Sequence, residues 1–151
     1  MKNTLRAAIL PLVMLTMTAH VKAQPEISDT HEAISQVVKD YFNGMANGDL
    51  DLMAKAFDME YGDIKYMVPD ENTKKTTIRD IHFSEFVNVF KNLSNMPWTG
   101  KILSLDVVDD RMAMVKFSLK TDKRDYVDYL AMYKRNGNWR IINKMTIDTR
   151  K

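Results

Sequence analysis

The stretch YVDYLAMYKRNGNWRIINK, residues 126–144, is the part of the sequence that decides the fold. Residues 126–134 form a β-rich run, and a second β-rich run occupies 139–148. Between them lies Asn136-Gly137-Asn138, a composition typical of a tight hairpin turn. The two runs are therefore predicted to pair as neighbouring antiparallel strands at the end of the chain.

Alternation along the first of these strands places one acid on an otherwise apolar face. Period two puts Asp128 on the same face as Tyr126 and Leu130. Asp128 is therefore a candidate functional acid. The favoured interpretation is structural, an ion pair or hydrogen bond with Lys116 or Lys144 from a neighbouring strand, because structural networks also place acids in sheets.

The hairpin continues a series of strands that begins earlier in the chain. Residues 99–108 and 112–121 are also β-rich runs joined by turn sequences, so the last third predicts an antiparallel meander. Two further strands are expected at 64–68 and 76–81, around a turn that begins at Pro69.

The front half of the chain carries helical signals. Apolar residues recur with helical spacing from Ile34 to Met45, and Asp29 is the expected N-cap before them. Gly48 is expected to end this helix, Asp49 to cap a second short helix, and Ser84 to cap a third. Helices first and hairpins later predict an α+β domain.

The first 23 residues have the layout of a secretory signal peptide. A basic start is followed by an apolar run at 7–19, and Ala23 is a small residue at the expected cleavage point. The apolar run is shorter than a bilayer-spanning helix needs. Residues 1–23 are therefore predicted to be removed, which leaves 24–151 as a single domain in the periplasm or outside the cell.

Charge and composition exclude several classes of protein. Without the first 23 residues the chain has 19 basic and 20 acidic residues, interspersed as on an ordinary solvated surface, so no nucleic-acid partner is predicted. No other segment is long and apolar enough to cross a bilayer, so no membrane partner is predicted after signal cleavage. The chain has no cysteine, which removes disulfides and a lipid anchor. His31 and His82 alone remain as histidines after export, so no histidine-built metal site is predicted. The sequence has no P-loop and no dinucleotide-binding fingerprint, and no cofactor is predicted.

Residues 126–144 resemble the closing hairpin of the putative lumazine-binding family, part of the nuclear transport factor 2-like (SnoaL-like) superfamily. The opening is similar too, with Tyr41, Asn47-Gly48-Asp49 and Phe57 in the order that such proteins use across their first two helices. The resemblance covers nearly all of 27–149. It implies a cone-shaped domain, in which three helices of the N-terminal half pack on a curved mixed or antiparallel β-sheet and a ligand pocket lies between them.

The sequence departs from its relatives at two places. Family members often have Phe-His at the end of the second helix, where this chain has Phe57-Asp58. In the ketosteroid isomerases of the same superfamily a helix-one tyrosine and a carboxylate base act together. Alignment matches Tyr41 to that tyrosine but puts Lys65 near the base position, and a lysine that is cationic at neutral pH is a poor proton acceptor. Isomerase chemistry of that type is not expected.

Aromatic side chains come from segments that would converge inside such a cone, and aromatic walls with a few polar groups suit a flat heterocyclic ligand. For most of these aromatics taken singly, core packing is the favoured interpretation, and for His82 a structural role is favoured. The candidate pocket residues are Tyr41, Phe57, Tyr61, Tyr66, His82, Trp98, Tyr126, Asp128 and Lys144.

Three functions remain open from the sequence. The first is an exported module that binds a small aromatic or heterocyclic ligand, with a lumazine-like or flavin-like compound implied by the resemblance. The second is a SnoaL-like cyclase or dehydratase that uses His82 or Asp128 as acid or base with Tyr41 as donor. The third is a homodimeric interaction module whose cone is filled and inert, paired through the outer sheet face. No catalytic motif supports the enzyme.

Overall fold

The fold was analysed in a computed structural model that describes residues 26–69, 72–73 and 75–149. The predicted signal peptide, 1–23, lies outside the described residues. No helix in the described part combines the length and the apolar character that a membrane crossing needs.

The first helix, α1 (Glu26–Asn47), is longer than its sequence signals indicated. Asp29 lies inside α1, so its predicted role as N-cap is wrong. The apolar stripe behaves as predicted, because Ile34, Val38 and Tyr41 follow one face at helical spacing and are all buried.

The second helix, α2 (Leu50–Ala56), begins as the sequence predicted. Asp49 is its N-cap, and the carboxylate accepts a hydrogen bond of 2.9 Å from the backbone N–H of Leu52. Gly48 turns the chain between the helices with a φ of +67°, a conformation that glycine adopts at little cost. Phe57, predicted as part of this helix, lies just beyond it and forms an isolated bridge with Ile141.

The third helix is shorter than predicted and begins differently. It comprises one α-helical turn, α3 (Phe83–Phe86), followed by a 3₁₀ segment, η1 (Val87–Phe90). Its N-cap is His82, whose Nδ1 accepts a hydrogen bond of 3.3 Å from the backbone N–H of Ser84. Ser84 was predicted as the cap, but it already lies within the first turn.

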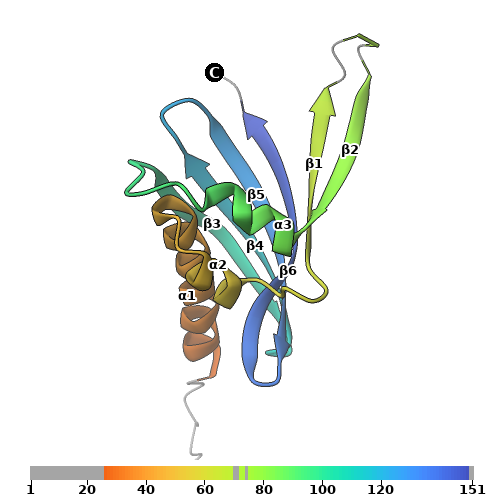
Figure 1. Cartoon of the computed structure of the whole chain (residues 1–151). Coiled ribbons are helices and arrows are strands. Elements are labelled where there is room, and N and C mark those ends of the chain that lie inside the picture. Colours follow the sequence, from red (N-terminus) through yellow and green to blue (C-terminus); the bar gives the residue numbers. More distant parts are fainter. Residues whose placement is uncertain (1–25, 70–71, 74, 150–151) are drawn as a thin grey trace, which may run out of the picture.

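Six strands form one mixed sheet, with the bounds β1 (Asp63–Pro69), β2 (Thr76–His82), β3 (Thr99–Val108), β4 (Met112–Lys120), β5 (Asp125–Arg135) and β6 (Asn138–Thr149). Their order is β2-β1-β6-β5-β4-β3 (Figure 1). The predicted meander β3 to β6 is antiparallel throughout, whereas β1 joins β6 in parallel. The sheet is therefore the mixed one that the family resemblance implied.

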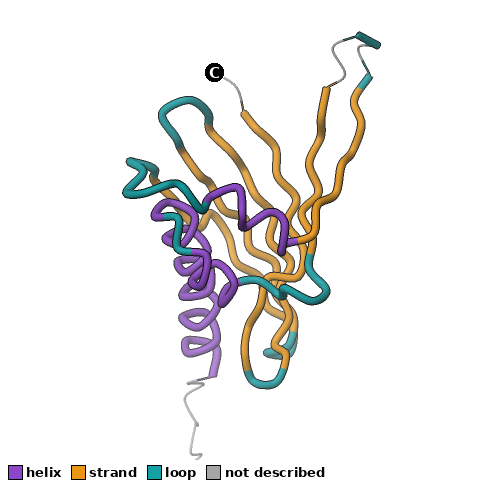
Figure 2. The backbone as a smooth tube through the Cα atoms, viewed as in Figure 1, coloured by secondary structure: helices purple, strands orange, loops and turns teal. Residues whose placement is uncertain are grey.

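The helices lie together on one side of the sheet (Figure 2). Alternation in the central strands follows from this arrangement: Leu130 and Met132 of β5 are fully buried beneath the helices, and Tyr129 and Tyr133 on the other face are exposed. The core extends over α1, α2, α3 and β4 to β6, and it includes Met53, Phe83, Val115, Phe117 and Ile141.

Candidate ligand-binding site

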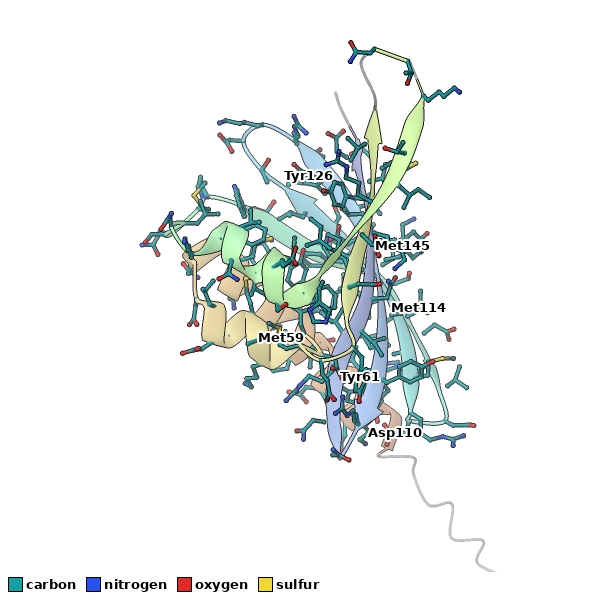
Figure 3. All side chains as sticks on the ribbon, turned by 45° about the vertical axis from the view of Figure 1, so that its right-hand side comes forward. Met59, Tyr61, Asp110, Met114, Tyr126 and Met145 are labelled. Carbon is teal, nitrogen blue, oxygen red and sulfur yellow. The ribbon has the colours of Figure 1, made fainter. Side chains whose placement is uncertain are left out.

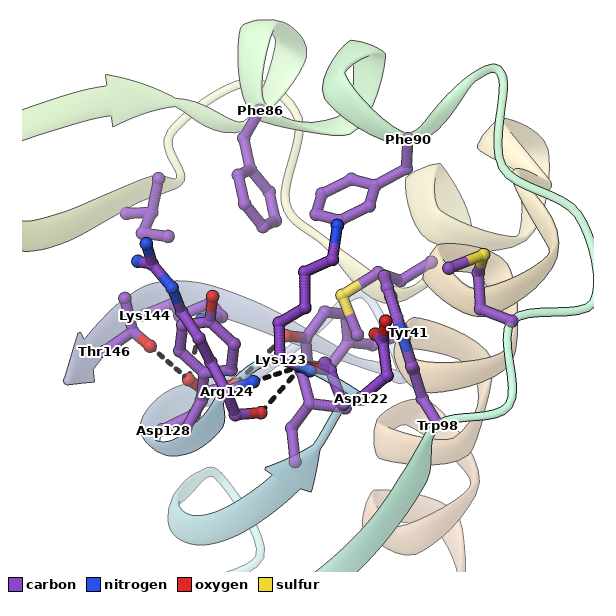
Figure 4. A pocket seen from close by; sticks show the side chains of 16 residues that line it. Tyr41, Phe86, Phe90, Trp98, Asp122, Lys123, Arg124, Asp128, Lys144 and Thr146 are labelled. Carbon is purple, nitrogen blue, oxygen red and sulfur yellow. Dashed lines mark hydrogen bonds and ion pairs between the residues drawn. The ribbon is translucent and has the colours of Figure 1, made fainter. Parts of the chain in front are cut away.

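A cavity of about 400 Å³ opens between the helical layer and the covered face of the sheet (Figure 4). This volume is within the range of about 300–1,000 Å³ that is usual for small-molecule sites. The interaction-module hypothesis expected a filled cone, and the structure instead has a cavity between the helices and the sheet. Its lining comes from α1, β1, α3, η1, the loop before β3, β4, the β4–β5 turn, β5 and β6: Tyr41, Met45, Ile64, Phe86, Phe90, Met96, Trp98, Leu119, Thr121, Asp122, Lys123, Arg124, Tyr126, Asp128, Lys144 and Thr146.

The floor of the cavity is a buried polar network centred on Asp128, which has no exposed surface. Oδ1 of Asp128 accepts a hydrogen bond of 2.7 Å from the Lys144 ammonium and one of 2.6 Å from the Thr146 hydroxyl. Oδ2 accepts a hydrogen bond of 3.0 Å from the Tyr41 hydroxyl. An acid with three donors is well solvated by the protein, which explains how a carboxylate persists in the core.

Strand register and helix packing bring these four residues together. Asp128 of β5 stands directly opposite Thr146 of β6, and Leu130 stands opposite Lys144. Since side chains two apart share a face, Lys144 and Thr146 both project beside Asp128. Tyr41 reaches the same point from α1, because its position in the apolar stripe aims it at the sheet.

Burial changes the acid–base properties of two members of the network. Burial lowers the pKa of Lys144, and the neighbouring carboxylate of Asp128 opposes that change. Burial also raises the pKa of Tyr41 well above its usual value, and the charge and hydrogen bond of Asp128 raise it further. Tyr41 is therefore an un-ionised phenol that donates to Asp128 at neutral pH.

The Lys144 ammonium also lies between aromatic rings. Its nitrogen is 5.9 Å from the centroid of the Tyr41 ring and 5.8 Å from that of Phe86. Such ring faces attract a cation and partly replace the water that it has lost. The same rings belong to the cavity lining, together with Phe90, Trp98 and Tyr126, so the floor is polar and much of the wall is aromatic.

The structure brings five of the nine predicted residues into this cavity: Tyr41, Trp98, Tyr126, Asp128 and Lys144. Tyr66 lines a second groove that adjoins it. Asp128 forms the predicted ion pair, and register selects Lys144 over Lys116, which lies over the Tyr129 ring on the opposite face.

Phe57, Tyr61 and His82 lie outside the cavity lining. Phe57 is a core residue stacked on Phe83 with ring centroids 4.1 Å apart. Tyr61 is 63% exposed and packs against the guanidinium of Arg135. His82 caps α3 and contacts the backbone oxygen of Glu60 at 3.2 Å through Nε2, so its described contacts do not bring it together with Tyr41 and Asp128.

Thr146 is the floor residue that sequence reasoning missed. Alternation on β6 would have found it, because it stands two positions after Lys144 on the same face. Phe86 and Phe90, which line the cavity from α3 and η1, were not among the candidate pocket residues either. Their contribution depends on how the short α3–η1 segment lies over the sheet, which no local pattern specifies.

Asp58, which replaces the histidine found in many relatives, has a structural role. It is buried, and Oδ1 accepts hydrogen bonds of 3.1 Å each from the backbone N–H groups of Glu60 and Tyr61. Oδ2 forms an ion pair of 2.8 Å with Arg135. Asp58 therefore fixes the turn that leads from α2 into β1.

Lys65, the residue near the position of the isomerase base, does not line the cavity. Lys65 forms an ion pair with Asp63 and lies outside the cavity lining, whereas the preceding residue, Ile64, contributes an apolar side chain to it. At this place the described lining therefore presents an aliphatic side chain, which cannot accept a proton.

Comparison with family models gives one match, described as putative lumazine-binding, over residues 29–146. The chain belongs to the putative lumazine-binding family. The match includes every residue that lines the cavity, from Tyr41 to Thr146. A search of curated proteins found no match.

Solved structures confirm the nuclear transport factor 2-like fold of this family member. A nuclear transport factor 2-like protein of unknown function from Shewanella baltica has a TM-score of 0.71 at 18% identity, covering 85% of this chain and 100% of its own. One from Silicibacter pomeroyi has a TM-score of 0.68 at 18% identity, covering 82% and 98%. A ketosteroid isomerase-like protein from Erwinia carotovora has a TM-score of 0.59 at 10% identity, covering 80% and 96%.

Proposed function

We propose that this protein is an exported binding protein for a small, flat heterocycle of the lumazine or flavin kind. The observation that carries the proposal is the cavity with a polar floor at Asp128 and Lys144 beneath aromatic walls. Flat rings gain contact area by stacking on aromatic side chains, and a few placed polar groups fix their orientation. The family to which the chain belongs supports the same class of ligand.

The test is a fluorescence titration of the protein comprising residues 24–151 against lumazine, a pterin and lumiflavin. Saturable binding of at least one of them is expected. Absence of binding across all three would refute this ligand class.

Two tyrosines on β5 offer a matched pair of variants for that titration. Tyr126 lines the cavity, and Tyr129, three residues later, projects from the opposite face. Tyr126→Leu is expected to weaken binding about tenfold, because it removes one aromatic wall. Tyr129→Leu is expected to leave it unchanged, and equal effects of the two substitutions would show that the ligand binds elsewhere.

We further propose that the protein is a homodimer. The exposed sheet face carries apolar side chains that adjoin across strands, since Tyr129 of β5 stands opposite Met145 of β6. Met114 and Met145 project from the side of the sheet away from the helices (Figure 3). Contiguous exposed apolar patches often mark protein–protein interfaces, and a second copy of the chain would cover this one.

A further inference from the structure

The cavity continues into a second groove because β1 and β6 separate. The two strands pair only from Asp63 opposite Asn143 to Tyr66 opposite Thr146. Beyond this point β1 continues to Pro69 beside β2, and β6 continues to Thr149 beside β5. Figure 1 shows the β1–β2 hairpin diverging from β6 at this end of the sheet.

A groove of about 860 Å³ occupies this divergence. It adjoins the cavity, because five residues line both: Ile64, Phe86, Arg124, Tyr126 and Thr146. Away from the shared boundary the groove is mainly apolar, with Val68 of β1, Ile81 of β2 and Val89 of η1 among its walls. A ligand held in the cavity can therefore extend an apolar substituent into the groove.

The charged side chains that line the cavity and the groove are balanced in sign. Lys144 pairs with Asp128 on the floor, and Arg124 pairs with Asp148 at 2.9 Å on the boundary. The remaining two charged lining residues, Asp122 and Lys123, are adjacent and of opposite sign. An ionic ligand would lose its hydration here without meeting a surplus of opposite charge, so the space favours an uncharged one.

Two hydrogen-bond donors in the cavity lining, the Lys144 ammonium and the Trp98 indole, have N–H groups without an acceptor among the described residues. The Lys144 ammonium has three N–H groups, and within the described part of the chain Asp128 is its one hydrogen-bond acceptor. The indole N–H of Trp98 is buried and has no acceptor in that same part of the chain. Buried donors are normally satisfied, so these groups favour a ligand that carries carbonyl oxygens.

We propose that the natural ligand is an uncharged ring that carries carbonyl groups and a long apolar substituent. The ring occupies the cavity, with a carbonyl oxygen accepting a hydrogen bond from Lys144, and the apolar substituent lies in the groove between β1 and β6. This inference rests on the proposed function, to which it adds the chemical class of the ligand and the part of the fold that holds its second half.

A matched pair of flavins tests the groove directly. Lumiflavin and 7,8-dimethyl-10-decylisoalloxazine have the same ring system and ring carbonyls, and they differ only in the substituent at N10, which is methyl in the first and decyl in the second. The decyl compound is expected to bind at least about tenfold more tightly, because burial of each methylene is favourable. Riboflavin and its 5′-phosphate test the charge argument, and the phosphate is expected to bind more weakly.

Variants locate the apolar substituent. Val89 lines the groove and is 69% exposed, so Val89→Glu places a charge at the groove with little effect on folding. It is expected to abolish most of the gain from the decyl chain and to leave lumiflavin binding unchanged within about twofold. Ile78→Glu is the control, since Ile78 is 73% exposed on β2 and lines neither the groove nor the cavity.

The outcomes separate this inference from the proposed function. If lumiflavin binds and the decyl chain adds nothing, or if Val89→Glu weakens both compounds equally, the groove has no role and the inference fails alone. Tighter binding of the phosphate than of riboflavin overturns the uncharged class. If neither lumiflavin nor the decyl compound binds, the proposed function fails and the inference fails with it.

Discussion

Asp128 is the residue on which the buried polar network depends. It is the counterion of a lysine that is itself only 4% exposed, and it also accepts hydrogen bonds from Tyr41 and Thr146. A buried pair of this kind adds little net stability relative to an apolar pair of the same size, but removal of one partner leaves an uncompensated charge.

Substitution of Asp128 tests that asymmetry. Asp128→Asn is expected to lower the free energy of unfolding by about 3–5 kcal/mol, measured by urea denaturation, because Lys144 stays buried without its counterion. The double variant Asp128→Leu, Lys144→Met is expected to be more stable than Asp128→Asn. Asp106→Asn, at an exposed site on β3, serves as the control. Stability of Asp128→Asn equal to that of the native protein would contradict the assigned role.

The second residue-scale prediction concerns acid stability. Burial alone would raise the pKa of Asp58, but the backbone N–H groups of Tyr61 and Glu60 and the guanidinium of Arg135 lower it below its ordinary value of 3.8. The resulting stabilisation is complete above the ordinary pKa and is lost as the pH falls through the folded-state pKa.

Asp58→Asn is therefore expected to reduce stability near neutral pH and to make the remaining stability less sensitive to acid. Urea denaturation at pH 6 and at pH 3 measures both effects. A variant whose stability falls between the two pH values as steeply as that of the native protein would show that Asp58 does not contribute.

At the scale of elements, the turn between α1 and α2 is held by close contact with the segment after η1. A Cβ added at Gly48 would lie 2.3 Å from the backbone oxygen of Leu93 and 2.9 Å from that of Phe90. Gly137, in the β5–β6 turn, has a similar positive φ of +79°, but a Cβ added there would have no described atom beyond its chain neighbours within 4 Å. The two glycines thus share a backbone conformation and differ in their surroundings.

Alanine at each glycine separates these two effects. Gly137→Ala is expected to cost about 1–2 kcal/mol of unfolding free energy, from the left-handed conformation alone. Gly48→Ala is expected to cost about 1–3 kcal/mol more, because the backbone around η1 must also move. Urea denaturation of both variants is the measurement, and equal losses would mean that the contact at Gly48 is not constrained.

At the scale of the whole molecule, the exposed sheet face predicts the assembly state. Light scattering of the protein comprising residues 24–151 is expected to give twice the mass of the chain. Tyr129→Glu is expected to shift the protein to monomer, because a carboxylate in an apolar interface must be desolvated. Val89→Glu, on the helical side, is expected to remain dimeric. A native protein that is monomeric at all concentrations would refute the proposed dimer.

The export proposal concerns the whole chain. Expressed with all 151 residues in a bacterial host, the protein is expected outside the cytoplasm with Gln24 as its first residue, as determined by mass spectrometry. A variant lacking residues 2–23 is expected to remain in the cytoplasm. Recovery of an uncleaved chain from the cytoplasm would contradict the signal peptide.

Local sequence patterns determined the order of the elements and the faces of the strands. The four strands of the C-terminal meander were placed within one or two residues of their observed ends, because alternation and turn composition act over a few neighbouring residues. The same alternation put Asp128 on the covered face. Capping was predicted less well: α1 extends through Asp29, and His82 replaces Ser84 at α3.

Only the tertiary structure decided which of those side chains meet. Tyr41 and Asp128 are 87 residues apart in the chain, and sheet register chose Lys144 over Lys116 as the partner of the acid. Tertiary packing also determined that Phe57 lies in the core and that Tyr61 and His82 lie outside the cavity. The separation of β1 from β6, where the groove lies, is likewise a feature of the tertiary structure. Periodicity fixes the direction of a side chain, whereas its neighbours depend on the register and packing of distant segments.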